Sequence, residues 1–150
     1  MENKDDIRLL NSEKLEEFFI NKNQKKYRVN QVLDWVWNKS ISSFSQMSNI
    51  SDDLKNILDK EFVLNKPIEI KSYKSSDGTI KYSIQLYDKN LIEAVLIPSK
   101  KRITACISSQ VGCSLDCVFC ATSILKRMRN LNIDEIFDQV FLMNQESLLN

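Results

Sequence analysis

Four cysteines, the only ones in the 150-residue chain, lie in the stretch "CISSQVGCSLDCVFC" from Cys106 to Cys120. Cys113, Cys117 and Cys120 have the spacing C-x3-C-x2-C, which lets three thiolates in a turning loop converge on one centre. Four thiolates would complete a zinc site or a closed iron–sulfur cluster, whereas three leave one metal corner open to a small molecule. Cys106 lies across an expected strand and would have to curl back to serve as a fourth ligand. The spacing therefore leaves two alternatives, an open cluster or a zinc site completed by Cys106.

The chain contains no histidine. This excludes a serine–histidine or cysteine–histidine nucleophile pair, an imidazole general base and imidazole ligands to zinc. The formal net charge of +1 argues neither for nor against a nucleic-acid partner. Basic residues gather in the ranges 22–28, 100–102 and 126–129. Two of these runs flank the cysteines, which favours an anionic partner there.

The N-terminus "MENKDDIRLL" has no apolar core of signal-peptide length. No window approaches the ~18 apolar residues of a membrane span. We therefore expect a cytoplasmic protein without a membrane partner. Thiols in that compartment are kept reduced, so clustered cysteines indicate metal binding or catalysis.

The first ~65 residues predict helices, because apolar residues recur at i, i+3 and i+4. Ser12, Asn30 and Ser51 are the expected N-caps. Trp35 and Trp37 could stack on bases, but tryptophan at helical spacing among aliphatic residues favours a core position.

After Pro67 the pattern alternates with the period of a strand. It predicts antiparallel strands at about 68–75, 79–87 and 91–97, joined by the turn signals "SSDG" and "DKN". Glu93 lies inside the last of these strands, and alternation alone places it toward solvent.

The last part of the chain reads strand, loop, helix. The run "ITACISSQ" is β-prone, the cysteine loop follows it, and a helix of about fifteen residues begins at Asp134. The expected apolar stripe of this helix consists of Ile136, Phe137, Val140, Phe141 and Leu148. One βα unit cannot bury both faces of its strand, so we expect it to be the start of a larger domain.

The cysteine spacing, with Phe119 before the last cysteine, resembles the radical S-adenosylmethionine motif. The stretch from "SSDGTIKYSIQLYDKN" to "SSQVGCSLDCVFCATS" resembles the RNA adenosine C2-methyltransferases that modify 23S ribosomal RNA and tRNA. "YRVNQVLDWVWNK" is similar to their helical N-terminal RNA-binding domain, and "RNLNIDEIFDQV" is similar to their first barrel helix. The chain departs from the family at Ser123 and Lys126, where glycine is common.

The resemblance implies an α+β fold in three segments. Residues 1–66 would form a helical RNA-binding-like domain and residues 67–101 an antiparallel β linker segment. Residues 102–150 would begin a truncated radical S-adenosylmethionine barrel, a partial (β/α) barrel of which only the first βα unit is present. Only 44 residues follow Cys106, whereas a full eight-fold barrel takes about 250.

The resemblance also divides the four cysteines. Cys113, Cys117 and Cys120 match the ligands of a [4Fe–4S] cluster whose open iron binds S-adenosyl-L-methionine. Cys106 matches a cysteine that resolves the covalent enzyme–RNA intermediate through a transient disulfide. Glu93 matches the proposed proton acceptor. These two are the catalytic residues that the resemblance implies.

The implied activity is that of a transferase which methylates C2 of adenosine through a methyl-cysteine. The implied partners are ribosomal RNA, tRNA and an electron donor, and we expect a monomer. No cysteine follows Cys120 to carry the methyl group, so we expect an N-terminal fragment that is inactive alone. Two other functions stay open, namely a related C8-adenosine methyltransferase and a non-catalytic RNA-binding module with a zinc site.

Overall fold

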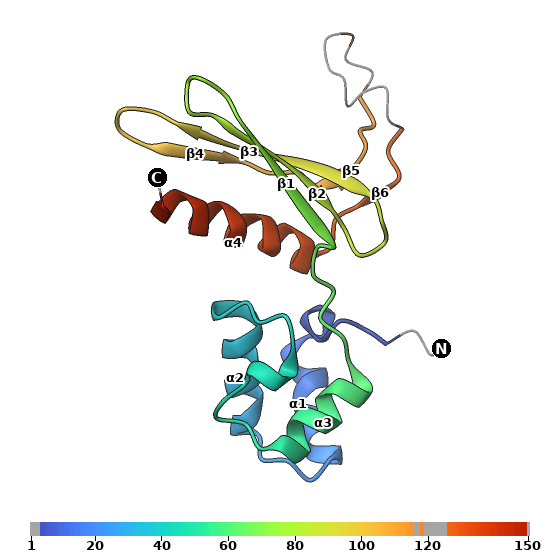
Figure 1. Cartoon of the computed structure of the whole chain (residues 1–150). Helices are drawn as coiled ribbons and strands as arrows, with labels where there is room; N and C mark the ends of the chain where they lie inside the picture. Colours follow the sequence, from blue (N-terminus) through green and yellow to red (C-terminus); the bar gives the residue numbers. More distant parts are fainter. Residues whose placement is uncertain (1–3, 116–117, 119–125, 150) are drawn as a thin grey trace. The chain divides into compact units, whose positions relative to one another are not determined.

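The computed structural model describes residues 4–115, 118 and 126–149 (Figure 1). The chain forms two compact units, Met1–Asn65 and Lys66–Asn150. The first is helical and the second combines antiparallel strands with one long helix, so the predicted α+β class is confirmed. The further boundary predicted between residues 101 and 102 stays a prediction.

Short helices make up the first unit. They are η1 (Ile7–Leu9), α1 (Ser12–Asn21), α2 (Tyr27–Leu33), η2 (Asp34–Asn38), η3 (Phe44–Gln46) and α3 (Asp52–Glu61). The cap predicted at Ser12 is wrong by one residue, because the side chain of Asn11 accepts the Lys14 backbone N–H at 2.9 Å. The cap predicted at Asn30 is also wrong, because α2 begins at Tyr27 and runs directly into the π-helical turn η2.

The core of the first unit is apolar. Its buried members are Ile7, Leu15, Phe19, Val29, Val32, Val36, Ile41, Phe44, Met47, Ile50, Leu54, Leu58 and Phe62. Trp35 and Trp37 pack against this core, as predicted. The indole N–H of Trp35 also donates to the Asn49 side-chain oxygen at 2.6 Å.

A buried ion pair joins the two ends of this unit. Asp6 and Arg8 lie 2.9 Å apart with both side chains fully buried. The Asp6 carboxylate also accepts the backbone N–H of Asn65 at 2.6 Å, and Arg8 donates to the Asn65 carbonyl at 3.1 Å. These bonds give the buried polar atoms of both side chains partners inside the unit.

Four strands form the sheet of the second unit. In order they are β1 (Glu69–Lys74), β2 (Ile80–Gln85), β3 (Leu91–Pro98) and β4 (Ile103–Cys106), all antiparallel to their neighbours. Two further short strands, β5 (Gln110–Val111) and β6 (Arg129–Asn130), form a separate ladder. The three predicted strands lie where the alternation placed them.

The strand after the basic turn continues this antiparallel sheet. β4 pairs with β3, from Val95 opposite Cys106 to Pro98 opposite Ile103. A (β/α) barrel is built on parallel pairs, and every pair between named strands in the described part of the chain is antiparallel. The expected first βα unit of a barrel is therefore not confirmed.

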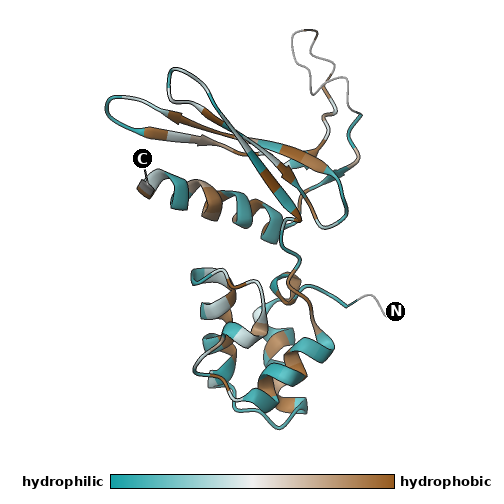
Figure 2. Cartoon of the chain, in the orientation of Figure 1, coloured by the Kyte–Doolittle hydropathy of each residue, from teal (hydrophilic) through white to brown (hydrophobic). Residues whose placement is uncertain are grey.

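Helix α4 (Ile133–Leu149) covers one face of the sheet (Figure 1). The buried side chains of this unit are Ile80, Tyr82, Ile84, Leu86, Ile92, Ala94, Leu96, Val111, Leu131 and Met143, and apolar segments alternate with polar ones along the strands (Figure 2). The predicted stripe of α4 is partly wrong. Val140 and Leu148 are exposed, whereas Ile136, Leu142 and Met143 pack on the sheet.

Among the described residues, no helix has both the length and the apolar character needed to cross a membrane.

Candidate functional site

Glu93 and Cys106 lie on the same face of the sheet. Cys106 ends β4 and pairs with Val95, which is two residues after Glu93 on β3. Side chains alternate along a strand, so all three point to one side. The buried neighbours Ile92 and Ala94 point to the other side, toward α4. The structure therefore brings the two predicted catalytic residues together on the face opposite α4, which we call the outer face.

The chain leaving β4 is held at Ser108. The Ser108 hydroxyl donates to the backbone carbonyl of Glu93 at 2.7 Å. The side chain of Gln139 in α4 makes two hydrogen bonds to the backbone of Ser108, as a neighbouring strand would. The Ser108 N–H donates to the Gln139 side-chain oxygen at 2.8 Å, and the Gln139 amide donates back to the Ser108 carbonyl at 3.0 Å. These bonds fix the backbone immediately after Cys106.

Gln139 was missed by the sequence reasoning, although it is almost completely buried. It lies three residues after Ile136 and four before Met143, both of which pack on the sheet. A polar residue at a core position of an amphipathic helix was the available signal, because a buried amide needs partners.

Glu93 has a cationic neighbour on the next strand. The Lys81 ammonium lies 2.9 Å from its carboxylate, and both side chains are about half exposed (49% and 57%). The hydrogen bond and charge of Glu93 raise the pKa of Lys81 above its usual value. Water screens such a pair, so it contributes little to folding. The arrangement leaves a carboxylate on the outer face that solvent or a ligand can reach.

Cys113 lies just beyond the β5–β6 ladder, which we call the stem. Gln110 pairs with Asn130 and Val111 with Arg129. Gly112 follows with φ of 71°, a left-handed conformation that glycine adopts readily.

Backbone hydrogen bonds continue the pairing beyond both ends of the stem. The N–H of Leu131 donates to the Ser109 carbonyl and that of Met128 to the Val111 carbonyl, both at 2.9 Å. Cys113 then forms an isolated bridge with Lys126. The stem thus brings together the two ends of the loop from Cys113 to Lys126.

Two of the three predicted cluster ligands, Cys117 and Cys120, lie outside the described residues. Cys113 is partly exposed and free, and its Sγ accepts the Leu115 backbone N–H at 3.4 Å. Within the described part of the chain no three metal-ligating side chains gather. The three thiols, without histidine, nevertheless fit the soft donor set of an iron–sulfur cluster.

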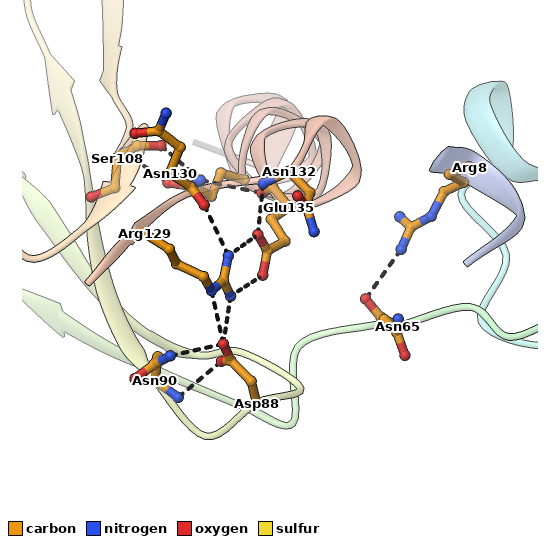
Figure 3. Close-up of polar contacts among 10 residues, drawn as sticks. Arg8, Asn65, Asp88, Asn90, Ser108, Arg129, Asn130, Asn132 and Glu135 are labelled. Atoms are coloured by element: carbon orange, nitrogen blue, oxygen red, sulfur yellow. Dashed lines mark hydrogen bonds and ion pairs between the residues drawn. The ribbon is translucent and has the colours of Figure 1, made fainter. Parts of the chain in front are cut away.

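Arg129 connects the stem to the rest of the unit (Figure 3). Its guanidinium donates to Asp88 in the β2–β3 turn and to Glu135 in the first turn of α4, with the shortest contact to each carboxylate at 2.7 Å. The sequence reasoning placed Arg129 in a basic run that favoured an anionic partner. The structure shows that two carboxylates of the chain itself engage this charge.

Comparisons with known proteins agree with the cysteine motif. Residues 6–64 match the family described as the ribosomal RNA large subunit methyltransferase N-terminal domain. The chain is 52% identical over 146 residues to the probable dual-specificity RNA methyltransferase RlmN of Christiangramia forsetii, covering 97% of the chain and 42% of that protein. It is 47% identical over 131 residues to the dual-specificity RNA methyltransferase RlmN of Buchnera aphidicola subsp. Cinara cedri, covering 87% of the chain and 36% of that protein.

A solved structure is also similar. The crystal structure of a radical SAM methyltransferase from Sphaerobacter thermophilus superposes with a TM-score of 0.80 at 28% identity, covering 97% of the chain and 43% of that protein. The chain thus spans about two fifths of the length of the proteins it matches.

Proposed function

The chain belongs to the RlmN family of RNA methyltransferases, and we propose that it carries part of the machinery that methylates C2 of adenosine in 23S ribosomal RNA and tRNA. The observation that carries the proposal is similarity along 97% of the chain to a named RlmN, in a sequence that includes the motif C-x3-C-x2-C. The expectation that these 150 residues do not methylate RNA by themselves stays a prediction.

In this proposal Cys113, Cys117 and Cys120 would hold a [4Fe–4S] cluster. When bound, the cluster would supply the electron for reductive cleavage of S-adenosyl-L-methionine. The chain's own contribution is placement, because the stem fixes where the loop leaves and rejoins the sheet.

Glu93 and Cys106 would act on the RNA adduct. The Glu93 carboxylate accepts the proton that leaves C2 of the adenine. The Cys106 sulfur, after giving its proton to solvent, attacks the sulfur of the S–CH2 bond that joins the protein to the RNA. The disulfide forms as that S–C bond breaks, and its electron pair goes to the methylene carbon, which takes up a proton and becomes the methyl group. Their common position on the outer face supports these roles, because one adenine must reach both groups.

The expected partners are RNA, S-adenosyl-L-methionine and an electron donor. Lys100, Lys101 and Arg102 are exposed in the turn between β3 and β4, and exposed cations of this kind bind phosphates. In the helical unit Lys22 is already paired with Glu61 at 2.6 Å. We therefore take the turn as a candidate contact for RNA phosphates.

Anaerobic reconstitution of the chain with ferrous iron and sulfide tests the cluster. We expect a brown protein whose iron and sulfide contents approach those of one [4Fe–4S] cluster, with the matching electron paramagnetic resonance signal after reduction. Cys113→Ala should abolish the cluster, whereas Cys106→Ala, the matched control, should keep it.

The same experiment distinguishes the zinc alternative. If the purified chain binds one zinc ion through all four thiols and forms no cluster, the proposal is wrong and the chain is a metal-stabilised binding module. Loss of the cluster in Cys106→Ala would also contradict the division of the cysteines into three ligands and one catalytic thiol.

A further inference from the structure

The guanidinium of Arg129 uses its whole donor capacity. Its Nε and Nη2 donate to Asp88 Oδ2 at 2.9 and 2.7 Å. Its Nη2 and Nη1 donate to the two Glu135 oxygens, both at 2.7 Å. Nη1 also donates to the Asn130 carbonyl at 3.1 Å. Arginine has five N–H donors, so each one has an acceptor within the chain.

The inner anchor of this contact is Glu135, whose side chain is only 2% exposed. One of its oxygens also accepts the backbone N–H of Asn132 at 2.8 Å, which caps the N-terminus of α4. The hydrogen bonds to Glu135 do most to raise the pKa of Arg129, and those to Asp88 add to the effect. A buried carboxylate held in this way gives Arg129 a fixed partner.

The outer anchor is Asp88, in the turn between β2 and β3. Asn90 donates to it through its backbone N–H at 3.1 Å and its side-chain amide at 2.7 Å. Burial alone would raise the pKa of Asp88, but the hydrogen bonds from Arg129 and Asn90 outweigh burial and lower it. The carboxylate is therefore ionised at neutral pH, and Asn90 helps to hold it in place beside Arg129.

Arg129 itself belongs to β6, the second strand of the stem (Figure 3). Its backbone pairs with Val111, two residues before Cys113. Arg129 therefore pairs through its backbone with the strand that leads into the cysteine loop. Its side chain binds the β2–β3 turn and the first turn of α4. The β5–β6 ladder has only two residues in each strand, and a two-stranded ladder alone is marginally stable in water.

We propose that Arg129 is a positioning residue for the cysteine loop. It holds the stem against the β2–β3 turn and the first turn of α4, and thereby determines how firmly the loop retains its cluster. The effect on cluster retention rests on the proposed function, whereas the role of Arg129 in holding the stem concerns only the described residues.

Three variants test the proposal. Arg129→Lys keeps the positive charge but loses the planar fork that engages both carboxylates. Asp88→Asn removes the outer anchor and leaves the pair with Glu135. Arg127→Ala is the matched control, because Arg127 also lies on the loop's return segment but its hydrogen bond, at 3.0 Å, is to the exposed Asn130 side chain.

Two measurements are needed on each folded variant, with circular dichroism as the check of folding. The first is amide hydrogen exchange of Met128 and Leu131, whose N–H groups close the ladder. The second is the rate at which a chelator removes iron from the reconstituted chain. In Arg129→Lys we expect both rates to rise about tenfold, as for loss of charge-assisted hydrogen bonds. Asp88→Asn should show a smaller rise, and Arg127→Ala none.

Unchanged exchange in Arg129→Lys would show that Arg129 does not hold the stem. Faster exchange with unchanged iron loss would overturn the positioning role. If Arg129→Lys fails to fold because Glu135 loses its partner, the amide exchange and iron-loss rates of Asp88→Asn decide the proposal by the same two criteria. Failure of the unsubstituted chain to bind a cluster would instead overturn the proposed function, and the exchange rates would still decide whether Arg129 holds the stem.

Discussion

The two faces of the four-stranded sheet carry different residues although the same strands build both. The inner face packs Ile80, Tyr82 and Ile84 under α4, with at most 8% of each residue exposed. The outer face presents Lys81 and Glu93, whose side chains are about half exposed. Burial of apolar surface stabilises the inner face, while the outer face adds little to stability. Neighbouring residues on one strand therefore serve different purposes, because one stabilises the fold and the next faces the proposed chemistry.

The largest effect should come from the inner face. Ile84 is 1% exposed and lies between Ile70 and Ile92 in the ladder. Ile84→Ala should lower the free energy of unfolding by about 2–5 kcal/mol, through lost burial and a cavity. Ser83→Ala, the adjacent outer-face control, should change it by less than about 0.5 kcal/mol. Urea unfolding followed by circular dichroism checks both, and equal effects would contradict the separation of the faces.

An intermediate effect should appear at alkaline pH. Burial, together with the nearby Glu146 carboxylate, raises the pKa of Tyr82 from 10.0 to about 12. The unfolded chain then loses this proton at a lower pH than the folded chain does. The contribution of Tyr82 to stability is complete below about pH 10 and is lost as the pH rises toward 12. In Tyr82→Phe, the free energy of unfolding measured with urea across this range should fall less steeply with pH. An unchanged fall would show that another group, and not Tyr82, causes it.

The smallest effect on stability should come from the exposed ion pair. Lys81→Met and Glu93→Gln should leave the urea midpoint of the chain unchanged within error, because water screens their interaction. Under the proposed function, Glu93→Gln should slow release of the RNA and accumulate a protein–RNA crosslink, visible on a denaturing gel. A midpoint that falls as far as in Ile84→Ala would show that the outer face also holds the fold together.

Local patterns were informative for the elements of both units. Alternation from Pro67 onward identified β1, β2 and β3, and helical spacing identified the helices of the first unit. The details that failed depend on distant partners. Val140 and Leu148 fit an apolar stripe of α4, but the sheet meets this helix along Ile136 and Met143 instead. Amphipathic spacing predicts a helix more reliably than it predicts which apolar residues the neighbouring element covers.

The candidate site divides in the same way. Cys113 stood out because cysteine spacing is a local property of the chain, and Glu93 and Cys106 came from the family resemblance. Gln139 was overlooked, and Arg129 was assigned to an anionic partner, because their roles depend on distant residues. Arg129 meets Asp88, 41 positions away, and Gln139 meets Ser108, 31 positions away.

The sequence by itself determined the kinds of element, the spacing of the thiols and the family, because each depends on residues close together in the chain or on resemblance. Tertiary structure alone decided that β4 extends the sheet beside β3, that Glu93 and Cys106 share its outer face, and that Arg129 ties the cysteine loop's stem to α4. Strand register and ion pairs between distant residues depend on which surfaces meet, and no short-range periodicity encodes that choice.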